Sequence, residues 1–171
     1  MRYFLLLLAL LGAPALASPE EAPATPAAAG NAPASHDDMV VVALSLIGTP
    51  YKFGGSSPDT GFDCSGLVQY ILGLSSPITL PRNSDEMFRM GKGHGIALSE
   101  LKAGDLLFFK VGKNSRRVNH VAVYIGEDRF VHAPSTGGMV RVDKLDTQYW
   151  MRWFTGAKRV LPENDRLASN P

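Results

Sequence analysis

The spacing of apolar residues changes part-way along the chain, and this change constrains the fold more than any other feature. In the first part, apolar residues recur at three- and four-residue intervals, as at Val40, Ala43, Leu44 and Ile47, which predicts amphipathic helices. From residue 105 onward they stand in short β-branched and aromatic runs between turn residues, as strands do. Helices followed by strands predict an α+β domain, with the helices packed on a mostly antiparallel sheet.

The boundaries of these elements follow from Gly, Pro and polar residues between the apolar runs. We predict helices over residues 37–47, 64–74 and 84–89. In the second helix the side chains expected to face the core are Leu67, Val68, Ile71 and Leu72. Strands are predicted over residues 105–110, 120–125, 130–132, 140–142 and 154–161.

The N-terminal residues are typical of a secretory signal peptide. Met1-Arg2 supplies a positive start, residues 3–11 form an apolar run, and Ala15-Leu16-Ala17 matches a cleavage site, so we expect cleavage after Ala17. The apolar run is too short to span a bilayer, which takes about 20 residues. We therefore expect a periplasmic or secreted protein without a membrane anchor after cleavage.

A spacer is expected between the signal peptide and the folded domain. Eleven of the 18 residues in 18–35 are proline or alanine, and such a segment buries too little apolar surface to fold. We expect the folded domain over residues 36–161 and a frayed tail over residues 162–171. The formal net charge of the chain is +1, which does not suggest nucleic acid as a partner.

Cys64 is the only cysteine of the chain. In an exported protein an unpaired thiol is a liability unless it is buried or used. Cys64 stands where a glycine-containing loop meets a predicted helix, and the free amides and positive dipole end of a helix favour the thiolate, which is the nucleophile of acyl transfer. Gly66 costs about 1 kcal/mol in a helix relative to alanine, which indicates that something approaches closely there.

The four histidines differ in their predicted surroundings. His36 borders the spacer and His94 lies among glycines, so both are expected in solvated loops. His120 begins one predicted strand and His132 ends the next. With residues 127–128 as a two-residue turn, His132 would lie three residues out of register with His120, about 10 Å along the strand and on the opposite face. A bulge or a three-residue turn would restore the face but not remove the offset.

Six short motifs, in this order, resemble the NlpC/P60 family of bacterial cell-wall peptidases over roughly residues 41–161. The motifs are Tyr51-Lys-Phe-Gly-Gly55, Asp63-Cys-Ser-Gly-Leu-Val68, Leu80-Pro-Arg-Asn-Ser84, Gly104-Asp-Leu-Leu-Phe-Phe109, Asn119-His-Val-Ala-Val-Tyr-Ile-Gly126 and Phe130-Val-His-Ala133. The resemblance implies a papain-like fold and a Cys-His-His catalytic set. Cys64 would be the nucleophile, His120 the general base, and His132 the residue that orients His120.

The resemblance also implies the groups around the nucleophile. The hydroxyl of Tyr51 and the backbone amide of Cys64 would hold the oxyanion, and losing one such donor costs about 3 kcal/mol of transition-state stabilisation. Asp63 and Ser65 would help to hold the substrate. One cysteine and no histidine pair at zinc-ligand spacing predict no metal site, and we expect no cofactor.

Three functions remain open from the sequence. The first is an exported endopeptidase that cuts either the D-γ-glutamyl–diaminopimelate bond or a peptide cross-link of peptidoglycan through an acyl-enzyme on Cys64. The second is a different amidase or acyltransferase that uses the same site, and the third is an inactive wall-binding protein that keeps the fold. For the first we expect peptidoglycan peptides as the partner and a monomeric enzyme.

Overall fold

The computed structural model describes residues 35–91, 93–136 and 138–162. The predicted signal peptide, the spacer up to residue 34 and the tail from residue 163 lie outside the described residues. Within the described part, no helix has both the length and the apolar character needed to cross a membrane.

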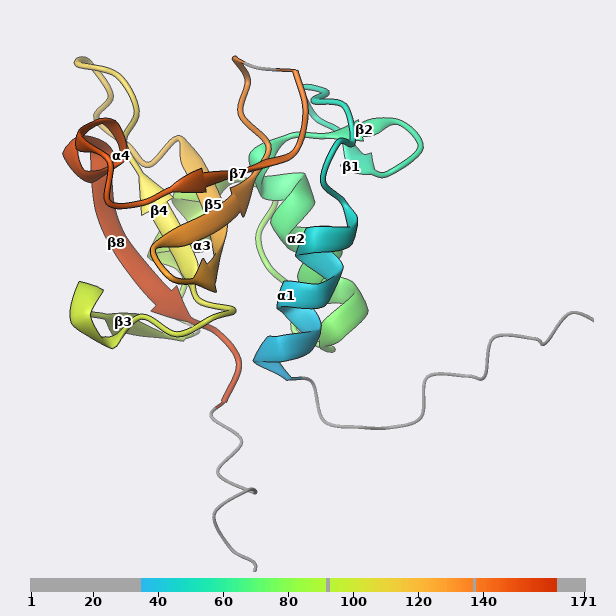
Figure 1. The fold of residues 1–171 in the computed structure, drawn as a ribbon, viewed down its shortest axis with the longest axis horizontal. Coiled ribbons are helices and arrows are strands. Elements are labelled where there is room, and N and C mark those ends of the chain that lie inside the picture. Colours follow the sequence, from blue (N-terminus) through green and yellow to red (C-terminus); the bar gives the residue numbers. More distant parts are fainter. Residues whose placement is uncertain (1–34, 92, 137, 163–171) are drawn as a thin grey trace, which may run out of the picture. The chain divides into compact units, whose positions relative to one another are not determined.

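The chain forms helices first and most of its strands afterwards, as predicted (Figure 1). The helices are α1 (His36–Ser45), α2 (Cys64–Ser75), α3 (Ser84–Arg89), the 3-10 helix η1 (Leu98–Glu100) and α4 (Gln148–Trp153). The strands are β1 (Ser56–Ser57), β2 (Gly61–Phe62), β3 (His94–Ile96), β4 (Leu106–Phe109), β5 (His120–Gly126), β6 (Arg129–His132), β7 (Arg141–Lys144) and β8 (Phe154–Arg159).

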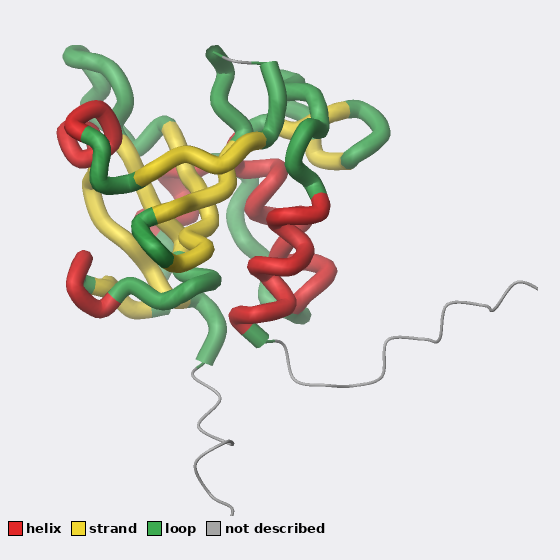
Figure 2. Tube along the Cα trace, viewed as in Figure 1, coloured by secondary structure: helices red, strands yellow, loops and turns green. Residues whose placement is uncertain are grey.

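Six of the strands form one antiparallel sheet in the order β3-β8-β4-β5-β6-β7. Helices α1 and α2 lie beside each other on one side of this sheet (Figure 2). The α+β class with helices on a mostly antiparallel sheet is confirmed. Strand β3, helix α4 and the short β1–β2 hairpin were not predicted from the sequence.

The two faces of the sheet bury different groups of side chains. One core lies between the sheet and α1, α2 and α3, and the four apolar residues predicted to face inward from α2 are all fully buried in it: Leu67, Val68, Ile71 and Leu72. Each such burial contributes about 1.5–3 kcal/mol. The second core is aromatic and includes Phe109, Phe130 and Trp150, so that α4 covers the sheet at this place.

Helix α1 buries only part of the predicted stripe: Ala43 is buried as predicted, but Leu44 and Ile47 are not. Leu44 is 42% exposed and Ile47 is 46% exposed, whereas Met39 and Ala43 are fully buried. The continuous apolar run at the start of this helix fits more than one helical phase, and packing against α2 selects the phase that includes Met39.

The hairpin between β5 and β6 differs from the simple pairing expected from the sequence. Glu127 and Asp128 both have positive φ (51° and 52°), the conformation of a two-residue type I′ turn. The pairing shifts between Tyr124 and Gly126, which leaves one extra residue on β5. This bulge returns His132 to the face that His120 occupies and shortens the predicted three-residue offset to two residues.

Candidate active site

Cys64 is the first residue of α2, and Asp63 fixes the start of this helix. The Asp63 carboxylate accepts a hydrogen bond of 2.7 Å from the Gly66 amide, as an N-cap residue does. A side chain on Gly66 is excluded because its Cβ would lie 2.1 Å from the carbonyl oxygen of Gly55. The close approach predicted at Gly66 is therefore confirmed, and the approaching group is the backbone of the preceding loop.

The sulfur of Cys64 lies against the beginning of β5. Burial raises the pKa of the Cys64 thiol; the backbone amide of Val121, one residue beyond His120, lowers this pKa, as do the amides of Ser65 and Cys64 itself. The raised pKa is the net result. This raised pKa disfavours the thiolate that we expected at the helix end, because the loss of water around the sulfur outweighs the helix amides.

His120 and His132 are in direct contact. Nε2 of His120 lies 2.8 Å from Nδ1 of His132, and the two rings are nearly perpendicular. The indole ring of Trp150 stacks on the His120 ring at 5.7 Å. The contact that the simple hairpin register did not allow is therefore present, and the bulge in β5 accounts for it.

Asp143 of β7 continues this chain of contacts. Its Oδ2 lies 3.1 Å from Nε2 of the fully buried His132, although the approach is oblique rather than linear. The same carboxylate accepts hydrogen bonds from Arg141, at 3.0 and 3.1 Å, and from the Trp150 indole, at 3.1 Å. These two donors hold the carboxylate of Asp143 beside the imidazole.

The contacts determine where the protons lie on both imidazoles. Burial lowers the pKa of His120 to about 3 and that of His132 to about 4, so both rings are neutral at pH 7. Burial opposes ionisation of Asp143, but the hydrogen bond from the Arg141 guanidinium lowers its pKa, so this group is an ionised acceptor. His132 then carries its proton on Nε2, its Nδ1 accepts from Nε2 of His120, and Nδ1 of His120 is left with a free lone pair.

Tyr51 lies close to the cysteine. Burial raises the pKa of the Tyr51 phenol, and the charges of Cys64 and Asp63 raise it further. The phenol therefore keeps its proton at neutral pH and can donate a hydrogen bond. A backbone contact fixes the position of Tyr51 in the fold: it forms an isolated parallel bridge with Phe62, which lies two residues before the nucleophile.

Asp63 and Ser65 belong to one network with Arg82, which follows α2 on the loop to α3. The guanidinium of Arg82 donates to both carboxylate oxygens of Asp63, at 2.9 and 2.7 Å, and to the Ser65 hydroxyl, at 2.8 Å. Burial raises the pKa of the Asp63 carboxyl, but the hydrogen bonds and the charge around it lower this pKa by more. The largest of these lowering causes is the hydrogen bond from Arg82, and the net result is a lowered pKa. The network places three polar groups beside Cys64.

The other two histidines lie in regular structure rather than in loops. His36 is the first residue of α1 and packs against Gly104, where an added Cβ would lie 2.9 Å from the imidazole. His94 is the first residue of β3, which pairs with β8 at the edge of the sheet. Our expectation of a loop is wrong for both residues: His36 begins a helix that packs against Gly104, and His94 pairs with Arg159 of β8.

Asp143 and Arg82 are the residues that sequence analysis missed. Arg82 stands inside one of the motifs that carried the family resemblance, but its spacing to Cys64 gives no hint of contact. Asp143 directly follows the strand predicted over residues 140–142, and the alternation of Arg141 and Asp143 on one face was the available signal.

Comparisons with known proteins identify the family of this chain. The model of the NlpC/P60 family matches residues 48–159. The murein DD-endopeptidase MepH of Escherichia coli is 43% identical over 118 residues, which are 69% of this chain and 43% of the relative. A gamma-DL-glutamyl hydrolase of Bacillus subtilis is 36% identical over 142 residues, 80% of this chain and 33% of the relative.

Solved structures give the same assignment. The crystal structure of an NlpC/P60 family protein from Bacillus cereus is similar with a TM-score of 0.67 and 35% identity, and the match covers 75% of this chain and 41% of that one. The chain thus spans less than half the length of each of these three relatives. From the family match and the site together, the chain belongs to the NlpC/P60 family.

Proposed function

We propose that this protein is an exported cysteine endopeptidase that hydrolyses amide bonds in peptidoglycan peptides. One observation carries the proposal: Asp143, His132 and His120 form a chain of contacts that leaves Nδ1 of His120 as a proton acceptor. The amide of the next residue, Val121, acts on the sulfur of Cys64. The names of two relatives, a murein DD-endopeptidase and a gamma-DL-glutamyl hydrolase, support the substrate class.

The first step is attack of Cys64 on the scissile carbonyl. The Sγ proton moves to Nδ1 of His120 while the sulfur bonds to the carbonyl carbon. The oxygen becomes negative and accepts hydrogen bonds from the Cys64 amide and the Tyr51 hydroxyl. The charge of Asp143 favours the protonated His120 that forms, which burial otherwise disfavours.

The second step divides the substrate. Nδ1–H of His120 gives its proton to the departing amine nitrogen, the C–N bond breaks and a thioester on Cys64 remains. A water molecule then attacks the thioester and gives a proton to Nδ1, and this proton returns to the sulfur when the acid leaves. Asp63, Ser65 and Arg82, which are hydrogen-bonded to one another, would bind polar groups on the acyl side of the substrate.

Digestion of purified sacculi, followed by mass spectrometry of the released muropeptides, tests the proposal. We expect the wild type to release fragments that Cys64→Ala does not release, and the masses will show whether the D-γ-glutamyl–diaminopimelate bond or a cross-link is cut. A panel of simple amides and esters serves as the comparison. The proposal would be contradicted if the enzyme cleaved the simple amides and esters but left the sacculi undigested. Full activity of Cys64→Ala would contradict it as well.

Export and a monomeric state complete the proposal. Residues 1–17 would direct export, and the mature protein would begin at Ser18 and act as a monomer in the periplasm or outside the cell, with no membrane anchor. The intact mass of the protein recovered from that compartment tests the cleavage after Ala17, and its sedimentation coefficient tests the monomer. A protein that retains residues 1–17 would contradict export by this signal.

A further inference from the structure

A cavity of about 230 Å³ opens beside the catalytic imidazole. It is lined by His120 together with Asn119, Ser135, Thr136, Tyr149 and Trp150. Cys64, Tyr51 and Asp63 are not among its lining residues. The cavity therefore belongs to the histidine side of the site rather than to the side of the nucleophile.

The chemistry of the proposed reaction decides which part of the substrate reaches this side. The acyl group is bound to Cys64, whereas the departing amine must receive a proton from His120 and so must lie within hydrogen-bond distance of that imidazole. A cavity that shares His120 but not Cys64 is placed for the amine part. Its volume lies below the ~300–1,000 Å³ of sites for drug-sized ligands, which suits a single residue of a peptide.

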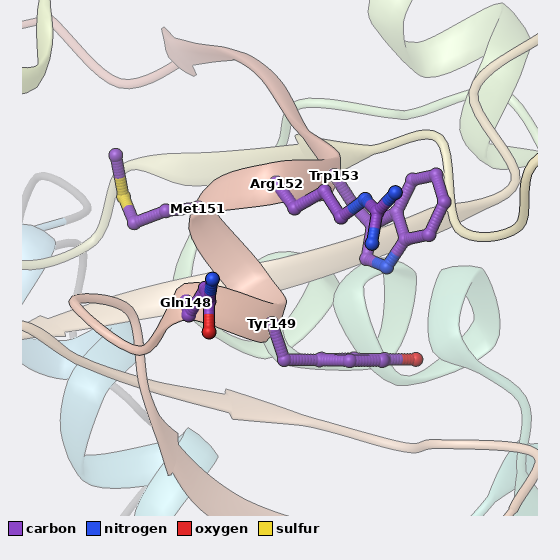
Figure 3. A pocket seen from close by; sticks show the side chains of 5 residues that line it. All are labelled: Gln148, Tyr149, Met151, Arg152 and Trp153. Atoms are coloured by element: carbon purple, nitrogen blue, oxygen red, sulfur yellow. The ribbon is translucent and has the colours of Figure 1, made fainter.

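A second, more open cavity of about 660 Å³ continues this surface along α4. Tyr149 lines both cavities, and the second is completed by Gln148, Met151, Arg152 and Trp153 (Figure 3). The guanidinium of Arg152 lies 5.2 Å above the Trp153 ring, and Figure 3 shows both side chains on the same side of α4 as Tyr149. The two cavities thus share Tyr149, and the second brings an exposed positive charge, Arg152, next to the first.

The neighbouring loop adds positive charge to this end of the domain. The amide of Lys110 donates to the carbonyl oxygen of Trp153 at 2.9 Å, so the loop between β4 and β5 begins beside α4. Lys113, Arg116 and Arg117 are exposed on this loop, which contains no acidic residue. No carboxylate occurs among the described residues that line the two cavities. Such a surface attracts anionic groups.

We propose that these two cavities bind the amine-side part of the substrate, and that this part is a peptide with free carboxylates, one of which pairs with Arg152. The inference rests on the proposed function. In the D-γ-glutamyl–diaminopimelate bond the departing amine belongs to diaminopimelate, a diamino dicarboxylic acid, so that substrate carries carboxylates on this side of the cleaved bond. The small cavity holds the first residue, and the open cavity over α4 holds the following anionic group.

Three synthetic amides that share one acyl part test the proposal. The first releases an amine-side peptide with free carboxylates, the second releases the same peptide as its carboxamide, and the third releases methylamine. We expect the wild type to show a higher kcat/KM for the first than for the second. Arg152→Gln should lower kcat/KM for the first amide about fivefold, the upper range for an exposed ion pair, and leave the other two unchanged. Added salt should reduce the same preference.

A variant that fills the small cavity tests whether substrate occupies that cavity, separately from the role of the Arg152 charge. Ser135→Trp should lower kcat/KM for both peptide-releasing amides and spare the methylamide. Arg129→Gln, which removes an exposed arginine at the start of β6, should change none of the three rates. Circular dichroism of each variant confirms that the fold is kept.

The outcomes separate the inference from the function on which it rests. If the wild type cleaves all three amides, but Arg152→Gln and Ser135→Trp lower all rates alike or none, the amine-side assignment is wrong and the peptidase remains. If the wild type cleaves none of the three amides and no sacculi, the proposed function itself fails.

Discussion

Asp143 Oδ2 lies 3.1 Å from Nε2 of His132, and this contact decides which nitrogen of His120 can accept a proton. An ionised carboxylate only accepts hydrogen bonds, so His132 must carry its proton on the nitrogen that faces Asp143. The tautomer of His132 in turn determines the tautomer of His120. A residue that touches neither the sulfur nor the substrate position thus acts as a positioning residue for the base.

Asp143→Asn should reduce kcat with little change in the fold. The amide of asparagine can turn its NH₂ group toward His132, which would reverse the proton positions on both imidazoles and leave a proton on Nδ1 of His120. We expect kcat to fall about 10–100-fold, as for other groups that orient a catalytic ligand or base. Asp146→Asn, an exposed neighbour on the same segment, is the matched control. An unchanged kcat and an unchanged pH profile in Asp143→Asn would rule out the positioning role.

The reactivity of Cys64 should follow a neutral thiol rather than a preformed thiolate. Because burial raises the pKa of this thiol and His120 is neutral, alkylation by iodoacetamide should become faster only above the ordinary thiol range, with no plateau near pH 6. The measurement is the alkylation rate from pH 5 to 10. A fast plateau near pH 6 that is lost in His120→Ala would show instead that a thiolate–imidazolium pair exists before substrate binds.

Acid should destabilise the fold through the two buried histidines. In the folded protein the pKa is about 3 for His120 and about 4 for His132, below the usual value of 6.5. Between these values and pH 6.5 the unfolded chain therefore binds more protons than the folded protein. The free energy of unfolding should therefore be largest above pH 6.5 and fall as the pH decreases toward 4. Urea denaturation at several pH values measures this loss.

The double variant His120→Gln His132→Asn isolates the effect of these histidines on acid stability. It should lose less stability than the wild type between pH 7 and pH 4, because neither replacement titrates. Equal losses in the two proteins would assign the acid sensitivity to other groups.

Several features of the fold were predictable because they depend on local spacing. The inward stripe of α2 is unambiguous in the sequence, since Leu67 and its partners are separated by polar or small residues. The stripe of α1 is not, because apolar residues occupy successive positions from Met39 to Leu44 and only contact with α2 selects among the phases. Helix α4 has a Thr147 cap but few apolar repeats, and aromatic packing on the sheet determines it.

The identity of the reactive residues could be predicted from the sequence, but the strand register that brings them into contact could not. Cys64 and the two histidines were recognisable from motifs, but their spacing along an ideal hairpin placed His120 and His132 on opposite faces. One extra residue in β5 brings them together, and a bulge of this kind leaves no mark in the sequence beyond Gly126. The contacts of Asp143 and Arg82 join segments far apart in the chain, which periodicity cannot reveal.

Tyr51→Phe should lower kcat without disturbing the fold. If the Tyr51 hydroxyl holds the oxyanion, its loss removes one donor from the transition state, which typically costs about 10²–10³ in kcat. KM should change little, because the donor acts mainly after attack. Tyr70→Phe, which removes a hydroxyl from a ring that packs on Phe62, is the control and should retain full activity. A Tyr51→Phe enzyme with the kcat of the wild type would leave the oxyanion to backbone amides alone.

Two glycines of α2 should respond in opposite ways to alanine. At Gly66 a Cβ would lie 2.1 Å from the carbonyl oxygen of Gly55, so Gly66→Ala must displace the loop or the start of the helix and should lower the free energy of unfolding by about 1–3 kcal/mol or more. At Gly73 nothing lies within 4 Å of the added atom, and Gly73→Ala should raise stability by about 0.5–1 kcal/mol through helix propensity. Urea denaturation of the two variants measures both changes.

Because Gly66 is two residues from Cys64, activity should fall with stability in Gly66→Ala and remain at the wild-type level in Gly73→Ala. Equal stability of the two variants would mean that the loop can move aside freely and does not fix the position of the nucleophile.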